Sequence, residues 1–343
     1  MSDTTANLRR HIKTASDLQA VVRTMKAIAA SHIGQYEKCV RALADYYRTV
    51  ELGLGSLFRD LPPTPGEGAQ DAAAQDGRFG AIVFGSDQGL VGQFNQVVTD
   101  HAIATLAALH GKAVFWAVGE RVQARLADAG VAVIGVFAVP NAVEGITSLV
   151  GRLQIASEAK RAEGGYDQLY VFHNRPKTGS LYEPVALRLL PLDRQWQDGL
   201  AKVAWPTKLR PEVMGSDPAT LRAYVREYLF ISLYRACAES LASENASRLA
   251  AMERADRNIK ESLEDLRQSF NRLRQSSIDE ELFDVISGYE SLTTAQKTHR
   301  QQPVRGAALR RPQEAQPGAA WAKDPGNAAR ALPDHAVTQK VKP

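Results

Sequence analysis

Residues 36–57 read YEKCVRALADYYRTVELGLGSL, and the spacing of their apolar side chains decides the fold of the amino-terminal region. From Tyr36 to Leu57 these side chains recur at alternating intervals of four and three residues. A sustained period of 3.5 residues is typical of the seam of a left-handed coiled coil. The pattern extends upstream, and no proline interrupts residues 7–59. The sequence therefore predicts one long helix within residues 1–60.

A second long helix is predicted at the other end of the chain, over residues 217–295. Asp217 can cap a helix, Pro218 suits the first helical position, and no further proline occurs before Pro303. The same 3.5-residue period continues here, although three seam positions are polar: Arg235, Asn245 and Asp256. We expect the two helices to wind around each other antiparallel as a left-handed coiled-coil shaft, with the longer second helix extending beyond the first.

Between these helices the sequence changes to short apolar runs rich in Val, Ile and Phe, separated by helical stretches. The runs lie at residues 79–84, 113–118, 131–137 and 168–174. The helical stretches lie at 94–110, 120–129 and 142–163, and residues 185–192 would add an edge strand. Buried strands that alternate with helices predict a mostly parallel sheet covered on both faces. We interpret residues 78–210 as an α/β domain on a coiled-coil stalk.

The charge of the chain is uneven. Its formal net charge is +4, but residues 296–343 carry nine basic against three acidic side chains, together with six of the sixteen prolines. Such a segment buries too little apolar surface to fold, so we predict a disordered basic tail. The rest of the chain is slightly acidic, which argues against a dedicated nucleic-acid-binding protein. The tail is either a solvated appendage or a contact for nucleic acid or anionic lipid.

Several classes of protein do not fit the composition. No run of about 20 uncharged apolar residues occurs, so no membrane-spanning helix is predicted. The first residues lack the apolar segment of a secretory signal, so we expect a cytosolic chain. Cys39 and Cys237 have no CxxC spacing, and the seven histidines show no paired ligand pattern. We therefore expect neither a disulfide scaffold nor a structural metal.

Residues 85–95, GSDQGLVGQFN, follow the first apolar run and open a helix, which is where nucleotide-binding domains place a phosphate-binding turn. The segment matches neither GxGxxG nor the P-loop pattern, and Ser86 lacks the GxSxG elbow of hydrolases. We interpret it as a structural turn involving Asp87, Gly89 and Gly92, with a nucleotide site as the alternative. No catalytic residue, cofactor-binding residue or metal ligand is predicted.

Two stretches of the second long helix carry surface features. Residues 239–261 place small Ala and Ser side chains at most positions outside the seam, which allows another backbone to approach closely. Tight helix packing is the ordinary explanation, and a protein-binding face is the alternative. Arg272, Arg274 and Gln275 crowd just before Ile278. They form either a solvated face or a site for acidic partners, because guanidinium groups make forked hydrogen bonds with carboxylates.

Four segments resemble signatures of the gamma subunit of F-type ATP synthases. They are MKAIAAS (25–31), SDQGLVGQFN (86–95), ESLASENASRLAAMERADRNIKE (239–261) and RQSSIDEELFDVISG (274–288). They occur in the order of that family and the resemblance spans residues 1–292, with the last two segments highly specific. The resemblance implies the central rotor shaft of a catalytic head, in which an antiparallel coiled coil carries a Rossmann-like domain.

The resemblance also implies partners. The coiled coil of this family sits inside a ring of three alpha and three beta subunits, and its foot meets the epsilon subunit and the c-ring of the membrane sector. Met25 and Lys26 would face the beta subunit, and Arg274, Gln275 and Asp279 would lie at its catch loop. These are contact roles, so no cofactor, nucleic acid or small-molecule substrate is expected. The chain would be peripheral, on the cytoplasmic face of the bacterial inner membrane.

The sequence departs from the family pattern at four positions. Gln88 stands where the family usually has Arg, His32 where it often has Lys, Asp279 where it has Thr, and Tyr289 where it has Ala. Asp279 adds a negative charge beside the presumed beta contact. The basic tail also continues past the family's usual end near Leu292. These departures look like an alternate, sodium-pumping branch of bacterial F-type ATPases.

Three hypotheses for the function follow. The leading one is a non-enzymatic rotor that transmits torque between the membrane ring and the catalytic head during ATP synthesis or hydrolysis. The first alternative is a nucleotide-binding α/β enzyme on a coiled-coil dimerisation stalk. The second alternative is an adaptor that binds nucleic acid or a membrane surface through its tail.

Overall fold

The computed structural model describes residues 4–60, 77–178, 180–209, 211 and 217–299. Most of the predicted basic tail lies outside the described residues, and its first four residues, 296–299, belong to a helix. The chain divides into two compact units, residues 1–278 and residues 279–343, and each is described by itself. The first unit contains the sheet, one long helix and most of the other, and the described part of the second unit is the end of that other helix.

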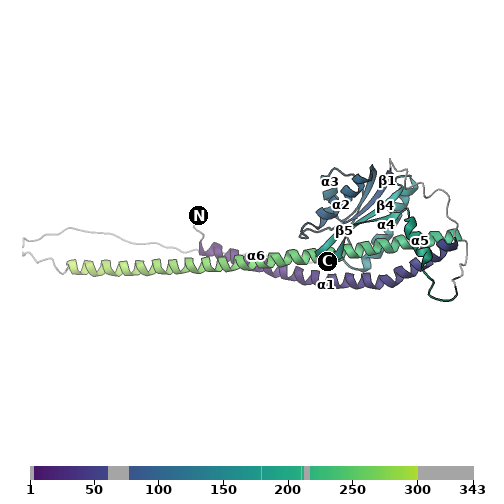
Figure 1. The fold of residues 1–343 in the computed structure, drawn as a ribbon. Coiled ribbons are helices and arrows are strands. Elements are labelled where there is room, and N and C mark those ends of the chain that lie inside the picture. The colour runs from purple at the N-terminus through teal and green to yellow at the C-terminus, as the bar shows by residue number, and fades with distance from the viewer. Residues whose placement is uncertain (1–3, 61–76, 179, 210, 212–216, 300–343) are drawn as a thin grey trace, which may run out of the picture. The chain divides into compact units, whose positions relative to one another are not determined.

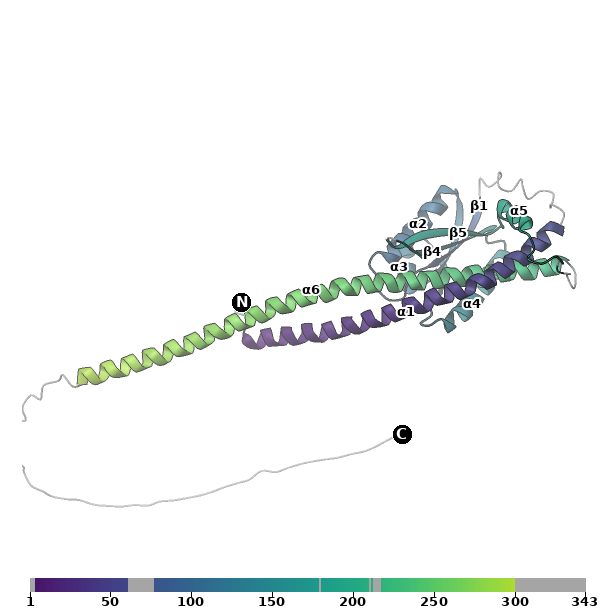
Figure 2. The ribbon, with the colours of Figure 1, turned by 60° about the horizontal axis from the view of Figure 1, so that its bottom comes forward.

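Helices α1 (Thr5–Asp60) and α6 (Asp217–His299) confirm the two predicted long helices, and α6 is the longer one, with 83 residues against 56. Within the first unit they run side by side (Figures 1 and 2). As the residue number increases along α1, the number of the contacting residue in α6 decreases. The contacts are Arg9–Phe270, Gln19–Asp256, Cys39–Tyr234 and Tyr46–Glu227. The antiparallel pairing expected from the sequence is therefore confirmed.

The seam of this helix pair uses the heptad positions predicted from the sequence. Seven of these α1 side chains are at most 6% exposed: Leu8, Val22, Ala29, Tyr36, Val50, Leu54 and Leu57. The three polar seam positions of α6 each have a partner, which is Glu239 for Arg235, the backbone of Leu241 for Asn245 and Gln19 for Asp256. Polar groups in a largely buried seam need such partners, so the seam continues through these positions.

The middle region forms one five-stranded sheet with the order β3-β2-β1-β4-β5. Its strands are β1 (Gly77–Phe84), β2 (Gly111–Val118), β3 (Val133–Phe137), β4 (Gln168–Lys177) and β5 (Ser180–Leu190). The first four strands pair in parallel, and β5 pairs with β4 in the antiparallel direction. The predicted mostly parallel sheet and its additional edge strand are both confirmed.

Helices cover both faces of the sheet, and the alternation of side chains along each strand separates two cores. The connecting helices are α2 (Phe94–Ala108), α3 (Glu120–Asp128) and α4 (Glu144–Ala162). On one face Ala81 and Val83 pack in a cluster with α2 and α3, the two helices that Figure 1 labels beside the sheet. On the other face Ile82 and Phe84 pack in a cluster with α4 and the two long helices. The coiled coil therefore shares a core with the sheet.

Helix α5, Arg194–Lys202, is not predicted by the sequence. Its start depends on Asp193, whose side chain accepts a 2.7 Å hydrogen bond from the Gln195 backbone nitrogen. The helix lies closely against α1. The approach is so close that a β-carbon added at Gly55 of α1 would lie 2.5 Å from the Leu200 carbonyl oxygen of α5. Short helices of this kind form on contact with a larger element.

Candidate functional site

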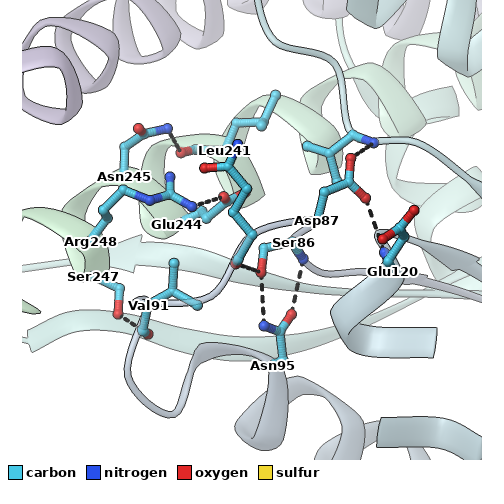
Figure 3. Close-up of polar contacts among 12 residues, drawn as sticks. Ser86, Asp87, Val91, Asn95, Glu120, Leu241, Glu244, Asn245, Ser247 and Arg248 are labelled. Atoms are coloured by element: carbon cyan, nitrogen blue, oxygen red, sulfur yellow. Dashed lines mark hydrogen bonds and ion pairs between the residues drawn. The ribbon is translucent and has the colours of Figure 1, made fainter. Parts of the chain in front are cut away.

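The turn after β1 is held by a network around Ser86 and Asn95 (Figure 3). The side-chain oxygen of Asn95 accepts a hydrogen bond from the Ser86 backbone nitrogen at 2.9 Å, and its amide donates to the Ser86 hydroxyl at 2.8 Å. That hydroxyl donates in turn to the Gln88 carbonyl oxygen at 2.8 Å. Leu90 and Gly92 have φ angles of 63° and 59°, in the left-handed region that favours glycine.

Asp87 connects this turn to two other segments. One of its carboxylate oxygens accepts a hydrogen bond from the Glu120 backbone nitrogen at 3.0 Å, and the other accepts one from the Val139 backbone nitrogen at 2.8 Å. Glu120 begins α3, and the free N–H groups of a helix start attract anions. The Asp87 carboxylate therefore fills a position where a bound phosphate could lie. Gly89 has no atom within 4 Å of where a β-carbon would stand.

The same turn packs against α6. The Ser247 hydroxyl donates a hydrogen bond to the Val91 carbonyl oxygen, and a β-carbon at Gly92 would lie 3.7 Å from that hydroxyl. Beside this contact Glu244 and Arg248 form an ion pair with an N···O distance of 2.6 Å, visible in Figure 3. Two segments that the sequence singles out separately, residues 86–95 and 239–261, thus meet in the folded chain.

The small side chains of residues 239–261 fall into two groups. One group is packed inside the first unit and at most 4% exposed: Ser240, Ala242, Ser243 and Ser247. The other group is partly exposed: Ala246, Ala250, Ala251 and Ala255. Beyond Met252 the helix presents exposed charged and polar side chains, such as Glu253, Arg254 and Arg257. Close packing within the chain therefore accounts for the first half of this segment.

A second polar contact joins α6 to the sheet through His173. His173 Nε2 lies 2.8 Å from Glu239 Oε2, and Arg235 Nε donates to Glu239 Oε1 at 2.8 Å. His173 and Glu239 are only 4% and 6% exposed. Burial raises the pKa of Glu239, but hydrogen bonds and charge from His173 and Arg235 outweigh it and hold that pKa below its usual value. The sequence assigns no role to His173, whose only signal is a polar residue inside the apolar run QLYVFHN.

Helix α6 occupies the region in which open α/β sheets bind ligands. The strand order reverses between β1 and β4, and ligands of such sheets lie beyond the carboxyl ends of the strands at this reversal. Val91, in the turn after β1, and His173, in β4 beside the end of β1, both contact α6. The cavity next to His173 has a volume of about 140 Å³, below the roughly 300–1,000 Å³ of small-molecule sites.

Met25 and Lys26 lie in α1 and are both half-buried. Lys26 Nζ is 3.9 Å from Glu253 Oε1 of α6. Three apolar side chains near them are more than half exposed and share helical spacing with Met25: Leu18, Val21 and Ile28. We call Leu18, Val21, Met25 and Ile28 the second stripe, because they lie beside the seam that pairs α1 with α6.

Arg274 and Gln275 are exposed on α6. They follow Glu253, the partner of Lys26, by about 30 Å of helix, so the structure does not bring them together with Met25 and Lys26. Asp279 belongs to the second unit and is also exposed. Apolar side chains on this stretch of α6 are 45–71% exposed: Ile278, Leu282, Phe283, Val285, Ile286, Tyr289 and Leu292.

Comparison with known proteins finds this architecture in ATP synthases. A family model described as ATP synthase matches residues 4–292. A rotor chain of the Euglena gracilis mitochondrial ATP synthase, rotational state 1, is 13% identical, with a TM-score of 0.54, over 81% of this chain and 100% of that chain. A chain from the OSCP/F1/c-ring structure of the same enzyme in rotational state 3 is 14% identical, with a TM-score of 0.54, over 90% of this chain and 100% of that one.

A further match is a chain from the central stalk/c-ring structure of the Tetrahymena thermophila mitochondrial ATP synthase, which is 20% identical. It covers 68% of this chain and 99% of that chain, with a TM-score of 0.49. The likeness to the Euglena chains concerns the fold. The family match takes in both long helices and the inserted sheet, and it defines this protein as an ATP synthase subunit. The chain belongs to the gamma-subunit family of F-type ATP synthases.

Proposed function

We propose that this chain is the central-stalk rotor subunit of an F-type ATP synthase and transmits torque between the ion-driven membrane ring and the catalytic head. The observation that carries the proposal is the family match over residues 4–292, which includes the antiparallel helix pair and the inserted sheet. Two long helices joined along a buried seam form a stiff rod, as a rotor requires. Its partners are the alpha and beta subunits, the epsilon subunit and the c-ring.

The chain itself performs no catalysis in this proposal, and ATP is bound and converted on the beta subunits. This absence of catalysis is supported by what lies at the carboxyl edge of the sheet. Helix α6 packs at this edge through Ser247 and Glu239, and the Asp87 carboxylate accepts a hydrogen bond from the backbone nitrogen of Glu120 at the start of α3. The edge at the reversal of strand order and the start of α3, two places that suit a nucleotide phosphate in an α/β domain, are thus occupied by the chain's own side chains.

The beta subunit contacts the second stripe through Met25 and its neighbours, and it also contacts the adjacent Lys26. Exposed apolar side chains at helical spacing are unfavourable in water and are typical of a face that packs against a partner. The exposure of Leu18, Val21 and Ile28 supports this assignment.

Arg274, Gln275 and Asp279 form a second contact with beta, at its catch loop. Arg274 and Gln275 are exposed and offer donors for carboxylates or carbonyl oxygens. Asp279, which stands where the family has Thr, adds a negative charge and selects a basic or neutral group on the partner. The exposed apolar side chains between Ile278 and Leu292 support a covered position for this stretch in the assembled complex.

The chain is a peripheral subunit of a membrane complex, which we place on the cytoplasmic face of the bacterial inner membrane, in the sodium-pumping branch. Among the described residues, no helix has the length and apolar character needed to cross a membrane. The coupling ion is set by carboxylates of the ring, so ATPase measurements of the assembled complex in sodium-free and sodium-containing buffer test the branch.

Co-purification tests the rotor function. The full chain, expressed with its alpha and beta subunits, should enter a complex whose ATP hydrolysis turns a bead attached to the chain. A chain that stays apart from alpha and beta would contradict the proposal. Calorimetry of the full chain alone with ATP, ADP and NAD distinguishes the rotor from the nucleotide-binding enzyme. We expect no heat signal for the rotor, whereas binding in the micromolar range would favour the enzyme.

A further inference from the structure

The directional contacts between the carboxyl edge of the sheet and α6 include His173–Glu239 and Val91–Ser247, and we call these two the sheet–helix junction. Glu239 and Ser247 are eight residues apart, about 12 Å along the helix. Both side chains are buried, at 6% and 4% exposure. The junction therefore connects α6 to the sheet at two separated points inside the protein.

In the sequence, residues 61–76 connect α1 to β1, and residues 191–216, which include α5, connect β5 to α6. Among the described residues, α6 contributes both large and small apolar side chains to the core that it shares with the sheet, such as Leu233, Leu241 and Ala238. Hydrophobic attraction is non-directional, so it fixes the orientation of a helix about its own axis less sharply than a hydrogen bond does. Hydrogen bonds depend on both distance and angle, so they oppose rotation of the helix about this axis.

The Glu239 contact is suited to hold a load. Its carboxylate is held from two sides, by His173 of β4 and by Arg235 one turn earlier in α6. Hydrogen bonds to charged groups are stronger than neutral ones, and breaking one in a buried place leaves a charge without a partner. Rotation of α6 against the sheet would break this contact and the Ser247 contact together.

We propose that Glu239 and Ser247 are the residues through which torque passes between the α/β domain and the shaft. In other α/β proteins this edge of the sheet binds ligands. Here it binds α6 and prevents that helix from rotating relative to the sheet. This inference rests on the proposed rotor function and identifies the place inside the subunit where the load is carried.

Rotary complexes assembled with full-length variants test the inference. Glu239→Gln and Ser247→Ala each weaken one contact of the junction, and the two changes can be combined. Arg226→Ala is the matched control, because Arg226 joins α6 to Glu158 of α4 through an exposed ion pair of 3.1 Å. The readouts are ATPase activity without load, rotation of a bead under viscous load, and hydrogen exchange of the α6 amides in residues 228–247.

We expect the junction variants to keep unloaded ATPase activity and to lose rotation rate as the viscous load increases, whereas Arg226→Ala behaves like the wild type. Loss of a buried charge-assisted hydrogen bond should speed exchange of amides in residues 228–247 by about tenfold or more, where exchange proceeds through local opening. If Glu239→Gln does not fold, the same measurements are made on Ser247→Ala, which removes only one oxygen atom and should therefore leave the fold intact.

Two results would overturn the inference. Unchanged rotation under load in the double variant would show that the junction carries no torque, and an equal loss of loaded and unloaded activity would show a structural role alone. Failure of the wild-type chain to join alpha and beta would instead contradict the rotor function, so the two failures are distinguishable.

Discussion

The side-chain amide of Gln19 in α1 donates a hydrogen bond of 3.1 Å to the carboxylate of Asp256, across the seam of the two long helices. Arg23 Nε and Lys260 Nζ lie 3.6 and 3.4 Å from the same carboxylate. Asp256 is only 7% exposed. Polar residues at a coiled-coil seam commonly fix the register of the helices. This contact therefore sets which part of α6 stands beside Lys26 and the second stripe.

The Gln19–Asp256 contact predicts coupling in a double-mutant cycle. Gln19→Ala and Asp256→Ala should each lower the Tm, and the double variant should lose less than the sum, because both single changes break the same hydrogen bond. Circular dichroism melts of the four proteins measure the coupling. Asp256→Ala combined with Val50→Ala, at a distant seam position, should be additive. Additivity of Gln19→Ala and Asp256→Ala would argue against a direct contact.

Glu239 predicts a loss of stability in acid. Its pKa lies below the ordinary value of 4.5, because His173 and Arg235 outweigh the effect of burial. A carboxyl with a lowered folded-state pKa stabilises the fold above its unfolded pKa, and this contribution is lost as the pH falls through the folded value. The stability difference between wild type and Glu239→Gln should be greatest above pH 4.5 and shrink below it. Urea melts between pH 3 and 7 measure it, and a constant difference would contradict the assignment.

Two glycines of α1 predict stability changes of opposite sign. A β-carbon at Gly55 would lie 2.5 Å from the Leu200 carbonyl oxygen, a backbone atom that cannot rotate away, so Gly55→Ala should destabilise by about 1–3 kcal/mol. At Gly34 a β-carbon meets nothing within 4 Å. Gly34→Ala should therefore stabilise the helix by about 0.5–1 kcal/mol. Chemical unfolding measures both, and equal signs would contradict the close approach of α1 and α5.

The second stripe predicts a specific loss of assembly. Val21 and Ile28 are 55% and 51% exposed, so Val21→Asp and Ile28→Asp should leave the isolated chain folded. A charge inside the proposed beta contact should weaken binding to the catalytic head by about tenfold or more. Ile155→Asp on α4, at an even more exposed position of 71%, is the matched control. Titration of labelled chain with the alpha–beta hexamer measures affinity, and equal binding of all variants would remove the stripe from the interface.

Much of the fold can be predicted because local periodicity reports which side chains are buried. The 3.5-residue spacing from Tyr36 to Leu57 predicts α1, and apolar runs such as 79–84 predict the strands, since both patterns repeat over short distances. Helix α5 is not predicted, and its position depends on contact with α1, which the local spacing of side chains does not report. The roles of Met25, Lys26, Arg274, Gln275 and Asp279 remain predictions, because they concern surfaces of other chains.

By itself the sequence determined the two long helices, their common seam and the inserted parallel sheet, because each follows from a repeating pattern of apolar side chains. Only the tertiary structure decided what fills the carboxyl edge of that sheet. A turn such as residues 85–95 suits either a ligand or a packed helix, and periodicity does not tell which distant residue a polar group will meet. Glu239 and His173 are 66 residues apart, and their pairing depends on α6 folding back across the sheet.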